Sequence, residues 1–213
     1  MLFRSAYEQE ILRKLHEMEQ GEPPQPTAPP LQNANKAKMI KKRGQEAKRQ
    51  ALYRMSGVDM TQIDAIGVET VEVVVSEYGS DLSRFPTEKQ FVSHATLAPR
   101  VPKSGGKPLK KKKRNSASTR VAAALRMAAL SLRHSQTALG AYYRRMAQRR
   151  GGDIAVFATA RKLATLIYRL LRWGQPYVDE GAAAYENRYR QHRIGRLAAT
   201  AKQLGYQLTP VSA

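Results

Sequence analysis

MTQIDAIGVETVEVVVSEYG occupies residues 60–79 of this 213-residue chain, and its conformation separates a mainly α-helical fold from one that contains a β-sheet. The β-branched cluster Val71, Val73, Val74 and Val75 favours a strand by propensity. The alternative is a helix, a turn through residues 66–68 and a second helix that ends near the next glycine. The residue types alone leave both possibilities open.

The segments that follow this stretch carry helical patterns. Pro and Glu in the first turn predict a helix over residues 85–97. Apolar residues then recur at helical spacing over residues 120–146, 154–173 and 182–204, with Gly140 as a possible kink in the first of these ranges. The chain is therefore predicted to be mainly α-helical.

The first fifty residues differ from the rest in composition. Residues 1–20 carry apolar side chains at spacings of three and four, which predicts a short amphipathic helix. Residues 21–50 predict a linker that is Pro-rich and then basic, and residues 21–35 contain five of the eleven prolines. The compact domain is predicted to span residues 51–213.

The charge distribution indicates a polyanionic partner. No acidic residue lies between Glu88 and Asp153, whereas residues 89–150 supply sixteen Lys or Arg. The whole chain has a formal charge of +20 and a pI near 10.4. So many like charges repel one another in a compact unit unless an anion lies against them. Nucleic acid is the expected partner, because the densest run, residues 110–114, lacks the apolar face of a membrane-binding helix.

Composition also excludes several kinds of chemistry. The chain has no cysteine, which excludes disulfides, thiolate zinc sites and cysteine nucleophiles. Its acidic residues are scattered and its four histidines are isolated, so no metal site is predicted and no cofactor is expected in this chain. Tyr185 and Tyr189 lie one helical turn apart, but the arginine and histidine set of a tyrosine recombinase is not recognisable around them. Neither a signal peptide nor a membrane span is legible, so a cytoplasmic protein is expected.

Ser104 is the strongest candidate for a nucleophile. It is flanked by Lys103 and Lys107, and Gly105 and Gly106 between them would let backbone amides approach a phosphate oxygen. A serine that attacks a phosphodiester must lose its proton and must face a phosphorus centre that gains negative charge, which cations and amides stabilise. The alternative is that Ser-Gly-Gly is the ordinary composition of a flexible loop, because residues 99–118 predict a disordered basic loop.

Taken in order, several blocks resemble the C-terminal domain of a bacterial insertion-sequence transposase family. Members join an N-terminal RuvC-like domain with four acidic catalytic residues to a C-terminal serine-bearing domain, and they include the invertase that switches pilin genes. The resemblance spans residues 52–210 and rests on GVDMTQID (57–64), RFPTEK (84–89), SGGK (104–107), LRMAA (125–129), GAYYRRM (140–146), ATARKLA (158–164) and YVDEG (177–181).

The resemblance implies a site and partners. It makes residues 60–78 similar to a helix-hairpin-helix module, and it makes Ser104 the nucleophile that attaches to DNA during transposition. It also implies DNA, a guiding noncoding RNA, and a homo-oligomer or a partner that supplies the RuvC-like domain with its Mg²⁺. The expected nucleic-acid contacts are Lys103, Gly105, Gly106, Lys107, Lys110, Lys111, Lys112, Lys113, Arg114, Arg120 and Arg126.

The chain also departs from the family pattern. No RuvC-like strands or acidic tetrad precede residue 52, which suggests a truncated or partial copy. Ala65 stands where the helix-hairpin-helix module usually has its first glycine, and Thr96 stands where the family commonly has glycine. Two alternatives therefore remain, namely a non-catalytic basic nucleic-acid-binding protein and an inactive transposase remnant.

Overall fold

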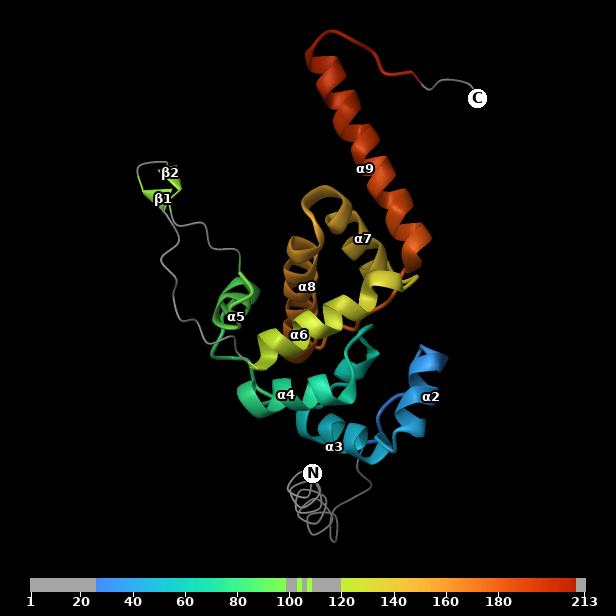
Figure 1. Cartoon of the computed structure of the whole chain (residues 1–213), viewed down its shortest axis with the longest axis vertical. Coiled ribbons are helices and arrows are strands. Elements are labelled where there is room, and N and C mark those ends of the chain that lie inside the picture. The colour runs from blue at the N-terminus through green and yellow to red at the C-terminus, as the bar shows by residue number, and fades with distance from the viewer. Residues whose placement is uncertain (1–25, 99–102, 105–106, 109–119, 210–213) are drawn as a thin grey trace.

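The computed structural model describes residues 26–98, 103–104, 107–108 and 120–209, and Figure 1 shows a helical body from which one long helix projects. The mainly α-helical fold is confirmed. The expected helix over residues 1–20 lies outside the described residues.

Residues 60–78 are helical rather than extended. A short 3₁₀ helix, η1 (Met60–Gln62), precedes a turn, and α4 (Val68–Tyr78) follows. In α4 the side chains Val68, Val71, Val75 and Tyr78 are buried at spacings of three, four and three. Burial of this helical stripe outweighs the strand propensity of the valines. The strand alternative is wrong, and the helix that ends at Tyr78 is confirmed.

The turn before α4 differs from the expected one. It runs from Ile63 to Ile66, whose backbone amide donates to the Ile63 carbonyl at 3.1 Å. Ala65 has a φ of +66°, and Gly67 is the N-cap of α4. A positive φ at the third residue of a hydrogen-bonded turn is the type II geometry that favours glycine. The turn therefore lies a few residues earlier than the sequence predicted, and its first helical element is a single 3₁₀ turn.

The helices after the basic loop pack around α8 (Gly152–Trp173). Its residues Ala160, Leu163, Ala164 and Ile167 are fully buried. The core continues into α4, α5 (Glu88–His94), α6 (Arg120–Ser131) and the start of α7 (Ala138–Arg150). One buried side chain ties distant segments together, because the Tyr168 hydroxyl donates to the Phe85 carbonyl at 2.7 Å.

The apolar stripe over residues 120–146 forms two helices and does not kink at Gly140. The break comes earlier, at η2 (Leu132–His134) and the residues that lead to the N-cap Thr137. Gly140 lies in the first turn of α7, where a Cβ atom would come within 2.2 Å of the Ser135 carbonyl oxygen. The glycine is needed for this close approach of two backbone segments.

Residues 34–50, which the sequence predicted as part of a linker, are helical and packed on the core. They form α2 (Ala34–Lys42) and the first half of α3 (Glu46–Ser56), and Ile40 is 5% exposed. The Lys36 ammonium donates to the carbonyls of Thr61 and, at 2.8 Å, Ile63. A basic composition concealed this packing, because a lysine stem and a single buried isoleucine make the contacts that a larger apolar stripe usually makes.

Side-chain amides hold the proline-rich segment before α2. Gln50 donates to the Pro26 carbonyl and accepts from the Ala28 amide, both at 2.9 Å. Gln62 repeats this pattern four residues later, donating to the Pro30 carbonyl at 3.1 Å and accepting from the Gln32 amide at 3.4 Å. Each glutamine thereby reproduces the pair of hydrogen bonds that a neighbouring strand would supply.

The last helix, α9 (Gly181–Gln203), projects from the body (Figure 1). None of its residues is buried, and it is joined to the body chiefly through the first turns, which lie against α7. Within the described ranges, no helix is long and apolar enough to cross a membrane.

Candidate nucleic-acid interface

Ser104 lies on a small hairpin within the segment expected to be a loop. β1 (Lys103–Ser104) and β2 (Lys107–Pro108) pair in antiparallel register, with Ser104 opposite Lys107 and Lys103 opposite Pro108. A two-residue connection such as Gly105-Gly106 is typical of a tight hairpin turn, which explains why a glycine-rich stretch pairs here instead of remaining irregular throughout. The hairpin thus brings Ser104 and Lys107 to opposite backbone positions.

The predicted contacts outside the hairpin are separated from it. Arg120 begins α6 and is exposed, and Figure 1 shows the hairpin well apart from that helix. The Arg126 guanidinium lies 5.3 Å from the Phe157 ring centroid, on another side of α6. The structure therefore does not bring Arg120 or Arg126 next to Ser104. The remaining predicted contacts lie outside the described residues, namely Gly105, Gly106, Lys110, Lys111, Lys112, Lys113 and Arg114.

A network of hydrogen bonds supports the turn at residues 63–66. The Tyr177 hydroxyl donates to Asp64 Oδ2 at 3.0 Å, and Lys36 holds the carbonyls on the other side of the turn. Burial raises the pKa of Asp64, and burial together with Asp64 and Asp179 raises the pKa of Tyr177. These groups position the turn that precedes α4.

Thr96 has the second unusual backbone conformation. Its φ is +59°, and among the described residues it and Ala65 are the only non-glycine residues with a positive φ. These are the two positions at which the family resemblance implies glycine. The backbone geometry that glycine would favour is thus present, although the glycines themselves are not.

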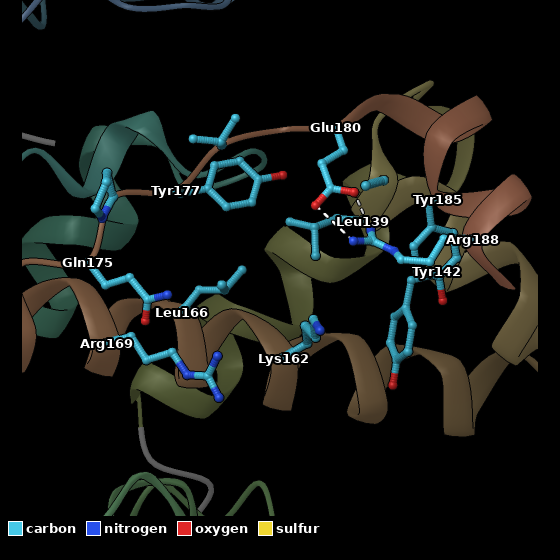
Figure 2. Close-up of a pocket in the computed structure, with 13 residues that line it drawn as sticks. Leu139, Tyr142, Lys162, Leu166, Arg169, Gln175, Tyr177, Glu180, Tyr185 and Arg188 are labelled. Carbon is cyan, nitrogen blue, oxygen red and sulfur yellow. Dashed lines mark hydrogen bonds and ion pairs between the residues drawn. The ribbon is translucent and has the colours of Figure 1, made fainter. Parts of the chain in front are cut away.

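A pocket of about 330 Å³ opens between α7, α8 and the segment that joins α8 to α9 (Figure 2). It unites three sequence blocks that carry the resemblance, through Tyr142, Lys162 and Tyr177. Sequence reasoning missed it because its members are far apart along the chain. Its polar lining comprises Tyr142, Lys162, Arg169, Gln175, Tyr177, Glu180, Tyr185 and Arg188.

The cations of this pocket already have partners. Arg188 Nη1 donates to Glu180 Oε1 at 2.9 Å, and Figure 2 shows the two groups meeting above Leu139. Arg169 Nε donates to Glu88 Oε2 at 2.8 Å, and Lys162 Nζ lies 5.8 Å from the Tyr142 ring centroid. A polar, partly neutralised pocket of this kind suits a small hydrogen-bonding group better than a strong anion.

The tyrosines near α9 have packing contacts. The Arg145 guanidinium carbon lies 3.4 Å from the Tyr189 ring centroid and 4.7 Å from the Tyr185 ring centroid. Burial raises the pKa of Tyr185 despite the neighbouring Arg145 cation. A phenol with a raised pKa stays protonated at neutral pH and is a poor nucleophile. Tyr185 and Tyr189 both lie against Arg145 at the junction between α7 and α9.

The described residues do not fit a divalent metal ion. No group of three or more His, Asp or Glu side chains converges within the part of the chain that the structure describes. A hard cation such as Mg²⁺ needs several oxygen ligands around one point.

Comparison with known proteins agrees with the resemblance over the central region. Residues 59–144 match the model of the Transposase IS116/IS110/IS902 family. This range contains the turn at 63–66, the Ser104 hairpin and α6. Neither the curated proteins nor the solved structures yield a match to the chain. The family match supports an insertion-sequence transposase.

Proposed function

We propose that this chain binds DNA and takes part in strand transfer during transposition, with Ser104 as the nucleophile. The observation that carries the proposal is that three features overlap in one part of the chain, around residues 59–144. These are the family match, the acid-free basic stretch and the serine hairpin.

The basic stretch supplies the binding part of this proposal. A protein that contacts phosphates with Lys and Arg releases condensed counterions, and this release dominates affinity at low salt. Lys110 to Lys113 and Arg114 stand between the hairpin and α6 in the sequence, so they are suited to contact the strand that enters the hairpin. Arg120 would contact the same strand at the start of α6.

The hairpin supplies the chemical part. The Ser104 hydroxyl would give its proton to a base as its oxygen forms a bond to phosphorus, and the bond from phosphorus to one bridging ribose oxygen would break. Lys103, Lys107 and the glycine amides would stabilise the charge that develops on the phosphorus oxygens. The base and any Mg²⁺ would come from a RuvC-like domain supplied by a partner, because the described residues do not fit a metal site. A guiding RNA and a homo-oligomer belong to the same proposal.

DNA binding is tested first by titration at several salt concentrations. Replacing Lys110, Lys111, Lys112 and Lys113 with Gln should lower the slope of log K against log salt by about 3 to 4 on duplex DNA, at roughly 0.9 per phosphate contact. Ser104→Ala should leave affinity and slope unchanged, because a neutral hydroxyl releases no counterion. The proposal would be refuted if the wild-type protein showed no binding to DNA at low salt.

The nucleophile is tested by trapping a covalent adduct. Labelled DNA, Mg²⁺ and a RuvC-like domain of the same family are incubated with the chain and resolved on a denaturing gel. Wild type and the control Ser118→Ala should form an adduct, whereas Ser104→Ala should not. An adduct with Ser104→Ala would remove this serine from the mechanism. Tight binding with no adduct from wild type would favour the non-catalytic nucleic-acid-binding protein.

A further inference from the structure

A second basic surface lies far from the Ser104 hairpin along the chain. A groove of about 330 Å³ separates the end of α7 from the projecting part of α9. Arg149 lines it from α7, and Arg193 and Arg196 line it from α9. We call this surface the α7–α9 groove. Its full lining is Arg149, Tyr189, His192, Arg193, Arg196, Leu197 and Thr200, without an acidic residue.

Among the residues that the structure describes, the three arginines of the groove have no side-chain partner. Within the described part of the chain, Arg149, Arg193 and Arg196 form no ion pair and no hydrogen bond through their side chains. Nearby arginines differ, because Arg145 pairs with Glu186 and Arg188 pairs with Glu180. Acidic residues thus neutralise the cations at the base of α9 and leave those of the groove open.

We propose that the α7–α9 groove binds a phosphodiester backbone, as a site separate from the Ser104 hairpin. Three guanidinium groups that converge on one groove repel one another unless an anion lies between them. Guanidinium forks also match phosphate oxygens in geometry and can bind them bidentately. The groove therefore offers charge and geometry for a nucleic-acid strand.

The groove presents a row of side chains along α9. Arg193 and Arg196 are three residues apart and so rise about 4.5 Å along α9, on neighbouring parts of one face. Thr200 lies one turn further, where its hydroxyl donates to the Arg196 carbonyl at 3.0 Å, and Tyr189 closes the other end. Arg149 faces this row from α7, so a strand that follows α9 would be contacted from both walls.

The same features argue against a membrane surface. A helix that binds membranes needs a broad face of large apolar side chains. Over the exposed length of α9, the large apolar side chains are Ile194 at 41% and Leu197 at 52% exposure. Two such residues do not make a face, whereas arginines recur along the helix. We therefore commit to nucleic acid, and lipid vesicles become a control.

The test removes the groove charges without touching the hairpin. The variant Arg149→Gln/Arg193→Gln/Arg196→Gln should lose about 10- to 100-fold in affinity at 0.1 M salt. Its salt slope should fall by about 2.7 on duplex DNA and by about 2.1 on single-stranded DNA or RNA, at roughly 0.9 and 0.7 per contact. The form of nucleic acid on which the slope falls is the one that the groove holds.

A control variant matches the change in net charge. Lys38→Gln/Lys41→Gln/Lys42→Gln removes three exposed charges from α2 and should shift the slope much less. If the two triple variants lowered the affinity and the salt slope equally, the proposed binding at the α7–α9 groove would be wrong and the effect would come from net charge. Binding to anionic phosphatidylserine vesicles but not to nucleic acid would also overturn the proposal.

A labelling experiment tests the position directly. The chain has no cysteine, so Thr200→Cys introduces a single thiol at the groove. Bound DNA or RNA should slow its reaction with a charged maleimide at least several-fold, and undiminished labelling at saturating nucleic acid would contradict the proposal. The groove and the serine mechanism fail separately, because Ser104→Ala adduct trapping and groove protection use different residues.

Discussion

Replacing Thr96 with glycine should stabilise this protein. Thr96 follows the C-cap of α5, where its amide donates to the Ser93 carbonyl at 3.1 Å and the Leu97 amide donates to the Val92 carbonyl at 3.0 Å. This pair of hydrogen bonds is the Schellman motif, which places its central residue in the left-handed region and usually employs glycine. Thr96 adopts that conformation with a φ of +59°.

The magnitude follows from two opposing terms. A left-handed conformation costs an L-residue about 1 to 2 kcal/mol, and a β-branched residue tolerates it poorly. Glycine also stabilises the unfolded state, because it gives the unfolded chain more conformational freedom, and this reduces the gain by about 0.5 to 1 kcal/mol. Thr96→Gly should therefore raise the free energy of unfolding by about 0.5 to 1 kcal/mol and the Tm by about 1 to 4 °C. Urea unfolding measures this as a higher midpoint with an unchanged slope.

A reciprocal variant provides the control. Gly44 occupies the same position after α2, with a φ of +62° and the same two hydrogen bonds, from its own amide to Lys41 and from Gln45 to Ile40. No atom lies within 4 Å of a Cβ placed there. Gly44→Thr should therefore lose stability through the backbone alone, by about the amount that Thr96→Gly gains. Equal or lower stability of Thr96→Gly would refute the strain assigned to this residue.

Two further perturbations test the packing and the charges of the body. Gly140→Ala should lower the free energy of unfolding by about 2 to 4 kcal/mol, because its Cβ would lie 2.2 Å from the Ser135 carbonyl oxygen. Gly195→Ala, in the exposed helix α9, should raise it by about 0.5 to 1 kcal/mol. Thermal unfolding of the two variants measures both changes. Burial lowers the pKa of Lys36 to about 8 from 10.5. Between these two values the unfolded chain holds a proton that the folded chain releases, so stability should rise with pH across this window, by at most about 3 kcal/mol. Urea unfolding at several pH values should show a flatter profile for Lys36→Met, and identical profiles would contradict the role assigned to this amine.

The sequence predicted those parts of the fold in which local pattern and tertiary packing agree. The apolar spacing in α8 and α9 identified helices, whereas in α4 the residue types left both a strand and a helix open and only the family resemblance favoured the helix. The packing of α2 escaped prediction, because it depends on Lys36 reaching two carbonyls that lie 25 and 27 residues away. Such contacts leave no periodic signal.

The candidate interface shows the same division. The charge distribution and the candidate serine could be found from residue types, whereas the pairing of Ser104 with Lys107 lies in a segment that was predicted to be a disordered loop. The α7–α9 groove could not be found in this way, because Arg149 and Arg193 converge only after two helices have packed. Whether an arginine has a partner is a property of the folded chain.

The hydrogen bonds from two glutamines to the proline-rich segment determine which sequences this segment can tolerate. Gln50 and Gln62 hold backbone atoms only, and the prolines at 26 and 30 supply carbonyls, which any residue possesses. Apart from Leu31, which packs against the core, side chains in this segment can thus vary widely while its path is kept. Proline should not be tolerated at positions 28 and 32, because the backbone amide hydrogen at each position donates to a glutamine side chain and proline has no such hydrogen.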